Sequence, residues 1–263
     1  MTENTNKKRA YAQKARPTTG KKPYYGKKFD PRRQDRRQAT GDGVDVRIGQ
    51  NFPLTIKRLG INGEGIGYFK RKIVFVPGVL PDEVAVVKVT DVQPKYITAK
   101  VLKIREKSPS RVAPRDEYAD EVGGFELEHM TYPAQLAFKK DVIAQALEKF
   151  QPRGWTDYDL RDTIGMANPY EYRNKAQFPV RKIGDKLSVG MYKRSSHDLV
   201  DLPVVHTQDP ATMKVLRTVR DLLDKLSVSI YNEDKNRGTV KTIVARASHT
   251  TGEVQLTFVT NTD

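Results

Sequence analysis

Short alternating segments divided by glycine and proline constrain the fold of the first part of this chain. Phe52, Leu54 and Ile56 alternate with polar residues, a short apolar segment ends at Pro77-Gly78, and residues 83–89 alternate again before a last segment at 97–104. Alternation with a period of two predicts strands that bury one face. Four or five such strands between residues 44 and 105 predict a small closed or half-closed β-barrel.

Four glycines lie between the first two predicted strands, at Gly60, Gly63, Gly65 and Gly67. A glycine-rich segment binds a dinucleotide when it follows a strand and opens a helix. These glycines open no helix, so they do not predict a dinucleotide site.

Residues 106–162 are predicted to form a connector and a helix. The connector is rich in charge and holds Pro109 and Pro114. Apolar residues then recur near helical spacing over residues 132–150, up to the breakers Pro152 and Gly154. We expect the apolar side of this helix to pack against a core.

Residues 163–263 are predicted to form a second domain. A second amphipathic pattern covers residues 213–226, and strands at 242–246 and 253–259 flank a turn at 249–252. A helix placed between strands in this order predicts an α+β domain with a mainly antiparallel sheet and helices on one face.

Positive charge is concentrated at the start of the chain. The chain has 47 Lys and Arg residues against 32 Asp and Glu, a formal net charge of +15. Residues 1–40 alone hold 13 Lys and Arg against 3 Asp and Glu, a net +10, and are predicted to be a disordered basic tail. Aromatic residues are interleaved with the cations, which favours a tail that attracts RNA without specificity. The alternative is a tail that only increases solubility.

Several function classes are excluded by composition. The chain has no Cys, so it has no disulfide, thiolate metal site or thiol nucleophile. It has no apolar run of the roughly 18 residues that would span a membrane. The basic start lacks the apolar segment of a secretory signal, so we expect a cytoplasmic protein.

Residues 171–180 combine cations, amides and aromatic rings in ten positions. Cations can hold phosphates, while amides and rings can contact splayed bases of single-stranded RNA. Structural roles remain open: Arg173 could pair with Glu171 or Asp185, and Arg246 could form a salt bridge at a strand end. The candidate RNA-binding residues are Arg173, Asn174, Lys175, Gln177, Lys193, Arg194, His197 and Arg246. The scattered histidines predict no metal site.

Two segments carry a family resemblance. Residues 63–67 and 76–83, the second a Pro-Gly-x-Leu-Pro-x-Glu turn, resemble a TRAM domain, an OB-like RNA-binding barrel. Residues 172–177 and 189–201 resemble the central domain of the RNA uracil-5-methyltransferases. The resemblance covers about residues 44–263 and implies an RNA partner, most specifically 23S rRNA, and a monomer.

The resemblance also implies a reaction. Enzymes of this family add a Cys thiolate to uracil C6, so that C5 can take the methyl group of S-adenosylmethionine. Their nucleophile and cofactor loop lie in a C-terminal domain beyond the region that matches. We therefore expect that this catalytic domain is missing, that no residue of the chain is catalytic, and that the chain alone is inactive.

Many members of this family bind an iron–sulphur cluster through four Cys residues. The corresponding positions here are Asp116, Val122, Phe125 and, for the fourth, a position near Val205. Valine and phenylalanine cannot ligate iron, and clusters of this kind need thiolates. We expect no cluster, with Val122 and Phe125 packing in its place.

Three functions are compatible with these observations. The chain could be the N-terminal part of a 23S rRNA uracil-5-methyltransferase that recognises RNA for a catalytic domain. It could instead be a stand-alone RNA-binding protein, or a ribosome-associated factor. We favour the first.

Overall fold

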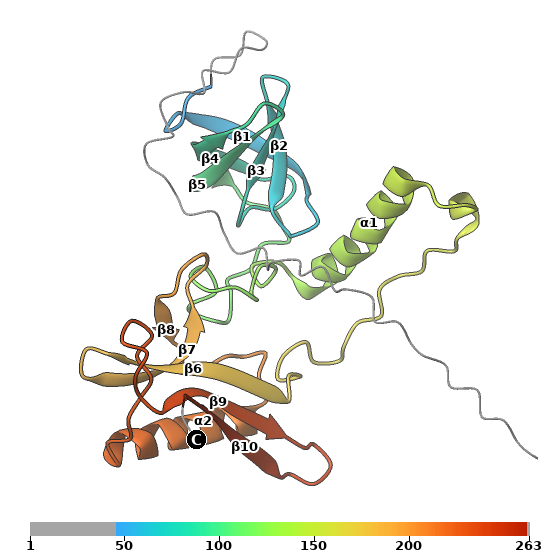
Figure 1. Ribbon diagram of the computed structural model, residues 1–263. Helices are drawn as coiled ribbons and strands as arrows, with labels where there is room; N and C mark the ends of the chain where they lie inside the picture. Colours follow the sequence, from blue (N-terminus) through green and yellow to red (C-terminus); the bar gives the residue numbers. More distant parts are fainter. Residues whose placement is uncertain (1–45, 262–263) are drawn as a thin grey trace, which may run out of the picture. The chain divides into compact units, whose positions relative to one another are not determined.

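The computed structural model describes residues 46–261, so the predicted basic tail lies outside the described residues (Figure 1). The first five strands form a closed barrel in the order β1-β2-β3-β5-β4. Only the β3–β5 pair is parallel. The predicted barrel is confirmed. Its strands are β1 (Asn51–Leu59), β2 (Gly65–Phe69), β3 (Lys72–Val76), β4 (Val84–Val92) and β5 (Tyr96–Glu106).

Alternating apolar side chains fill the barrel. Phe52, Leu54 and Ile56 of β1 point into its core, together with alternate residues of β3, β4 and β5. Glycine is needed at one position where β1 and β2 pair: a Cβ atom on Gly67 would lie 2.7 Å from the Thr55 carbonyl oxygen. Part of the glycine pattern is therefore explained by packing, since a larger residue would push the two strands apart.

A buried ion pair joins the barrel to the connector. Glu83 is fully buried, and its carboxylate accepts hydrogen bonds from the backbone N–H groups of Leu80 (2.8 Å) and Ser108 (3.2 Å). Arg111 donates to the same carboxylate through Nε and through Nη2 (2.8 Å). Its Nη2 also donates to the Gly78 carbonyl oxygen at 2.8 Å. The Pro-Gly-x-Leu-Pro-x-Glu turn thus ends in an anchor for the connector.

Helix α1 (Tyr132–Phe150) forms as predicted but is not buried as predicted. Only Ala134 and Phe138, near its start, pack against a small cluster of buried residues that includes Met130. No residue of α1 is buried, and Phe150 is 71% exposed. The expectation that this helix faces a core is wrong, because periodicity marks an apolar side but does not supply a partner to cover it. A short 3-10 helix, η2 (Trp155–Asp157), follows α1.

The second part of the chain forms a five-stranded sheet in the order β10-β9-β6-β7-β8, in which all neighbours are antiparallel (Figure 1). The predicted α+β fold with an antiparallel sheet is confirmed. The elements are β6 (Lys175–Ile183), β7 (Lys186–Tyr192), β8 (Leu199–Asp201), α2 (Pro210–Lys225), β9 (Val240–Ala247) and β10 (Val254–Thr260).

Helix α2 covers one face of this sheet (Figure 1). It begins where the Asp209 carboxylate accepts a hydrogen bond from the Ala211 N–H at 2.7 Å, with Pro210 in its first turn. Its buried side chains meet the inward residues of β6 and β9, chief among them Phe178 and Ile243. Because side chains alternate along a strand, the intervening residues point to the opposite face, which α2 does not cover. Within residues 46–261, neither α1 nor α2 is both long enough and apolar enough to cross a membrane.

Candidate nucleic-acid interface

Three of the predicted residues lie on the face of the sheet opposite α2. Lys175 and Gln177 alternate with the buried Ala176 and Phe178 on β6, so both point away from the core. Arg246 alternates in the same way with buried alanines on β9. We call this surface the open face; its exposed polar residues are Lys175, Gln177, Arg246, Gln255 and Thr257.

The strand register brings these residues into two rows. Lys175 lies directly opposite Arg246, which lies opposite Gln255 on β10. The next row on this face is Gln177, Val244 and Thr257. Like charges placed directly opposite each other in a sheet are unfavourable, and neither row contains an acidic residue to offset the pair. These two rows of the open face therefore carry two positive charges and no negative charge, beside amide groups.

Arg173 and Asn174 are held at the start of the open face by their backbones. The Arg173 N–H donates to the Thr207 carbonyl at 3.0 Å, and the Arg173 carbonyl accepts from the Asp209 N–H at 2.9 Å. The Asn174 carbonyl accepts from the Ala247 N–H at 2.8 Å. Both side chains are exposed. Within the part of the chain that the structure describes, no ion pair joins Arg173 or Arg246 to an acidic residue.

Lys193 and Arg194 face the connector instead of the open face. The Arg194 guanidinium donates through Nε to the Val122 carbonyl (3.0 Å) and through Nη2 to the Ala119 carbonyl (3.3 Å). Lys193 forms an ion pair with Glu121 at 3.3 Å. These contacts give both residues a structural role, and the structure does not bring them together with Lys175 and Arg246. His197 lies against the Tyr192 ring, with 5.8 Å between the ring centroids.

Four positions of this chain correspond to the Cys ligands of the iron–sulphur cluster in the uracil-5-methyltransferases that it resembles. Here their side chains make other contacts. Val122, Phe125 and Val205 are buried in the same apolar core. The Asp116 carboxylate is buried and accepts a hydrogen bond from the His206 N–H at 3.0 Å. Packing and hydrogen bonding occupy these positions, and these side chains do not fit an iron–sulphur cluster. Among residues 46–261, no group of three or more potential ligands is arranged for a metal ion.

A second acidic residue, Glu128, is buried beside Asp116. The Asp116 N–H donates to Glu128 Oε2 at 3.4 Å, and Glu128 Oε1 has no hydrogen-bond partner among residues 46–261. Burial, followed by the charge of Asp116 and a hydrogen bond with it, raises the pKa of Glu128 to about 7. The two carboxyl groups thus form a pair that disfavours a second negative charge. Sequence reasoning missed this pair, because no local pattern links positions 116 and 128.

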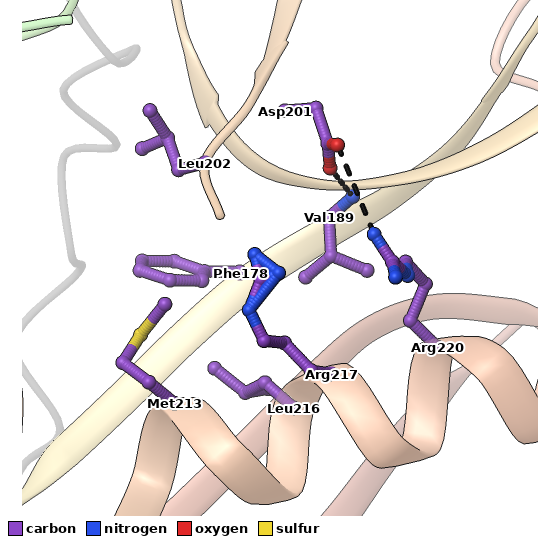
Figure 2. A pocket seen from close by; sticks show the side chains of 8 residues that line it. All are labelled: Phe178, Val189, Asp201, Leu202, Met213, Leu216, Arg217 and Arg220. Atoms are coloured by element: carbon purple, nitrogen blue, oxygen red, sulfur yellow. Dashed lines mark hydrogen bonds and ion pairs between the residues drawn. The ribbon is translucent and has the colours of Figure 1, made fainter. Parts of the chain in front are cut away.

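The space between α2 and the sheet is not a ligand site. Figure 2 shows the residues around it, with Phe178, Met213 and Leu216 side by side and Asp201 directed toward Val189 and Arg220. The cavity measures about 10 Å³, which is room for about one water. The Asp201 carboxylate accepts from the Val189 N–H at 2.9 Å and lies 3.9 Å from the Arg220 guanidinium.

Comparisons with known proteins agree with this architecture. Residues 45–102 match the model of the TRAM domain, so the barrel is a TRAM domain. The chain is 62% identical over 229 residues to an uncharacterized RNA methyltransferase of Lactiplantibacillus plantarum, covering 86% of this chain and 48% of that protein. It is 47% identical over 215 residues to one of Bacillus cereus, covering 82% and 47% of the two chains.

The fold is also found in a solved structure. The crystal structure of Pyrococcus abyssi tRNA (uracil-54, C5)-methyltransferase, in complex with S-adenosyl-L-homocysteine, superimposes with a TM-score of 0.55 at 22% identity. The match covers 79% of this chain and 46% of that one. The chain thus spans about half the length of the curated relatives it matches and of this structural neighbour.

Proposed function

We propose that this chain provides RNA recognition for an S-adenosylmethionine-dependent RNA uracil-5-methyltransferase, with 23S rRNA as its substrate. The TRAM domain, the RNA methyltransferase relatives and the fold shared with part of a solved tRNA methyltransferase support this proposal. The chain has no Cys, so a thiolate for attack on uracil C6 has to come from another polypeptide segment. S-adenosylmethionine would supply the methyl group and belongs to the same catalytic part.

The observation that most strongly supports this proposal is the row of Lys175, Arg246 and Gln255 across the open face. Two opposed cations in a row that holds no acidic residue are unfavourable in the free protein and become favourable when a phosphate lies between them. The amides of Gln177 and Gln255 are exposed beside the cations, where they can contact base edges. In this proposal the open face holds a single-stranded segment of RNA so that the target uridine can leave the stack.

The test is RNA binding by a variant with both Lys175→Ala and Arg246→Ala. We expect weaker binding to a short single-stranded RNA, and a salt dependence of affinity that is shallower by about one phosphate contact for each cation removed. The measurement is fluorescence anisotropy over a range of salt concentrations. Lys214→Ala with Lys225→Ala is the matched control, because it removes two exposed cations from α2, on the other side of the sheet. Equal salt slopes for the two double variants would contradict the proposal.

A further inference from the structure

A second group of cations and aromatic rings lies farther along the same sheet. Arg181 shares the alternation of Lys175 and Gln177 on β6, six residues from Lys175, which is about 20 Å along a strand. Its Nη2 donates to the Tyr192 hydroxyl at 2.7 Å. Its guanidinium carbon lies 5.8 Å from the ring centroids of both Tyr192 and Tyr231. Lys241 Nζ lies 4.3 Å from the Tyr231 ring centroid.

These side chains are partly exposed rather than part of the core. Neither Tyr192 nor Tyr231 belongs to the buried cluster between α2 and the sheet, and both keep some accessible surface. The Tyr231 hydroxyl donates to Asn236 Oδ1 at 3.0 Å, which fixes one edge of the ring and leaves its faces to the cations. Two rings are therefore presented at the surface by separate segments of the fold.

The charge around the rings is mixed but mainly positive. Glu233 is the one acidic group in contact with the cluster in the described part of the chain, and its carboxylate lies 3.7 Å from Arg181 Nη2. His197 lies beside Tyr192, with 5.8 Å between the ring centroids. The Lys241 ammonium forms no ion pair among residues 46–261 and lies against the Tyr231 ring. Such an ammonium can move from a ring to a phosphate at small cost, because its four-carbon stem is flexible.

Aromatic rings beside cations match the chemistry of unpaired nucleotides. A base offers an aromatic face to a tyrosine, and its flanking phosphates attract the nearby Lys and Arg. Stacking a base on a ring contributes more than an exposed contact between a cation and that ring. A bound base would therefore displace Lys241 from Tyr231, and the ammonium would pair with a phosphate.

We infer that Arg181, Tyr192, Tyr231 and Lys241 form a subsite for one unpaired nucleotide, whose base stacks on Tyr231 while Lys241 contacts its phosphate. Arg181, which donates to the Val180 carbonyl at 2.8 Å and to the Lys241 carbonyl at 3.3 Å, holds the two rings and adds positive charge. This inference rests on the proposed RNA-binding function and extends it. It places a second contact point on the strand that carries Lys175, so that one single-stranded segment of several nucleotides follows β6. Stacking makes the subsite tolerant of sequence, whereas the amides of the open face can read base edges.

The test uses the full chain and a short single-stranded RNA that carries 2-aminopurine, a base whose fluorescence falls when it stacks. We expect Tyr231→Leu to reduce affinity about fivefold or more and to abolish the quenching, since it removes a stacking face. Tyr231→Phe keeps the ring and should bind and quench like the wild type. Lys241→Gln should keep the quenching and lower the salt slope by about one contact.

The possible outcomes separate the subsite from the wider proposal. If the wild type binds RNA and Tyr231→Leu shows the same affinity and the same quenching, the subsite is overturned. The proposed RNA binding by the open face is then not affected. No RNA binding by the wild type would overturn the proposed function and the subsite together. Thermal unfolding of each variant shows whether the fold is kept. If Tyr231→Leu is unfolded, the salt dependence of RNA binding by Lys241→Gln is the deciding measurement. A salt slope equal to that of the wild type would overturn the subsite.

Discussion

Replacing Arg111 by alanine is expected to lower the free energy of unfolding by about 3–5 kcal/mol, because it leaves a buried carboxylate without its charged partner. Glu83 is fully buried, and Arg111 donates two hydrogen bonds to it. Burial alone would raise the pKa of Glu83, but the hydrogen bonds from Arg111 and from the Leu80 and Ser108 N–H groups outweigh it and lower the pKa. The carboxylate is thus held in its ionised form and depends on those donors.

Chemical denaturation at neutral pH measures this effect. Arg105→Ala is the matched control, because it removes an exposed arginine from the end of β5, close in sequence to Arg111. Replacing both partners, Glu83→Leu with Arg111→Met, should recover much of the lost stability, because it removes the buried charge as well. A loss of less than about 1 kcal/mol for Arg111→Ala, as expected of an exposed pair, would contradict the described role of the anchor.

Glu128→Gln is expected to flatten part of the pH dependence of stability. The folded protein holds a proton on Glu128 up to about pH 7, whereas an unfolded chain releases it near the ordinary glutamate value of 4.5. Between these values the folded state binds more protons, so the wild type loses stability as pH rises. The contribution is fully present below pH 4.5 and is lost above about pH 7. Glutamine does not titrate and keeps this contribution at every pH.

The measurement is the difference in unfolding free energy between Glu128→Gln and the wild type from pH 4.5 to pH 8. We expect this difference to grow in favour of the variant as pH rises and to level off above neutrality. Glu117→Gln, which removes an exposed carboxylate from the same connector, is the control. A difference that stays constant over this range would mean that Glu128 does not retain its proton.

Local sequence patterns predicted the barrel and the α+β domain but not the ion pair that joins the barrel to the connector. Alternation of Phe52, Leu54 and Ile56 predicted a barrel strand because the buried face of a strand repeats every two residues. Glu83 stood out only as part of a turn, since its partner lies 28 residues away. The apolar pattern of α1 predicted a helix correctly and its burial wrongly, because burial depends on a partner that the pattern does not contain.

The candidate interface was predicted only in part, because local patterns do not specify contacts between distant segments. Lys175 and Gln177 are two residues apart, so a strand places them on one face. The position of Arg246 opposite Lys175 depends on strand register over a long sequence separation, which local periodicity does not specify. Arg194 looked similar to Arg173 in sequence, yet its guanidinium binds backbone carbonyls of the connector. The cluster around Arg181 was missed because its rings come from separate segments.

The most direct measurement is photo-cross-linking of the wild-type chain to a single-stranded fragment of 23S rRNA, followed by mass-spectrometric mapping of the linked peptides. Binding on the open face predicts cross-links in peptides of β6, β9 and β10, with competition by unlabelled RNA. Cross-links confined to α2, on the covered face of the sheet, would contradict this account, as would the absence of any competed cross-link from the sheet.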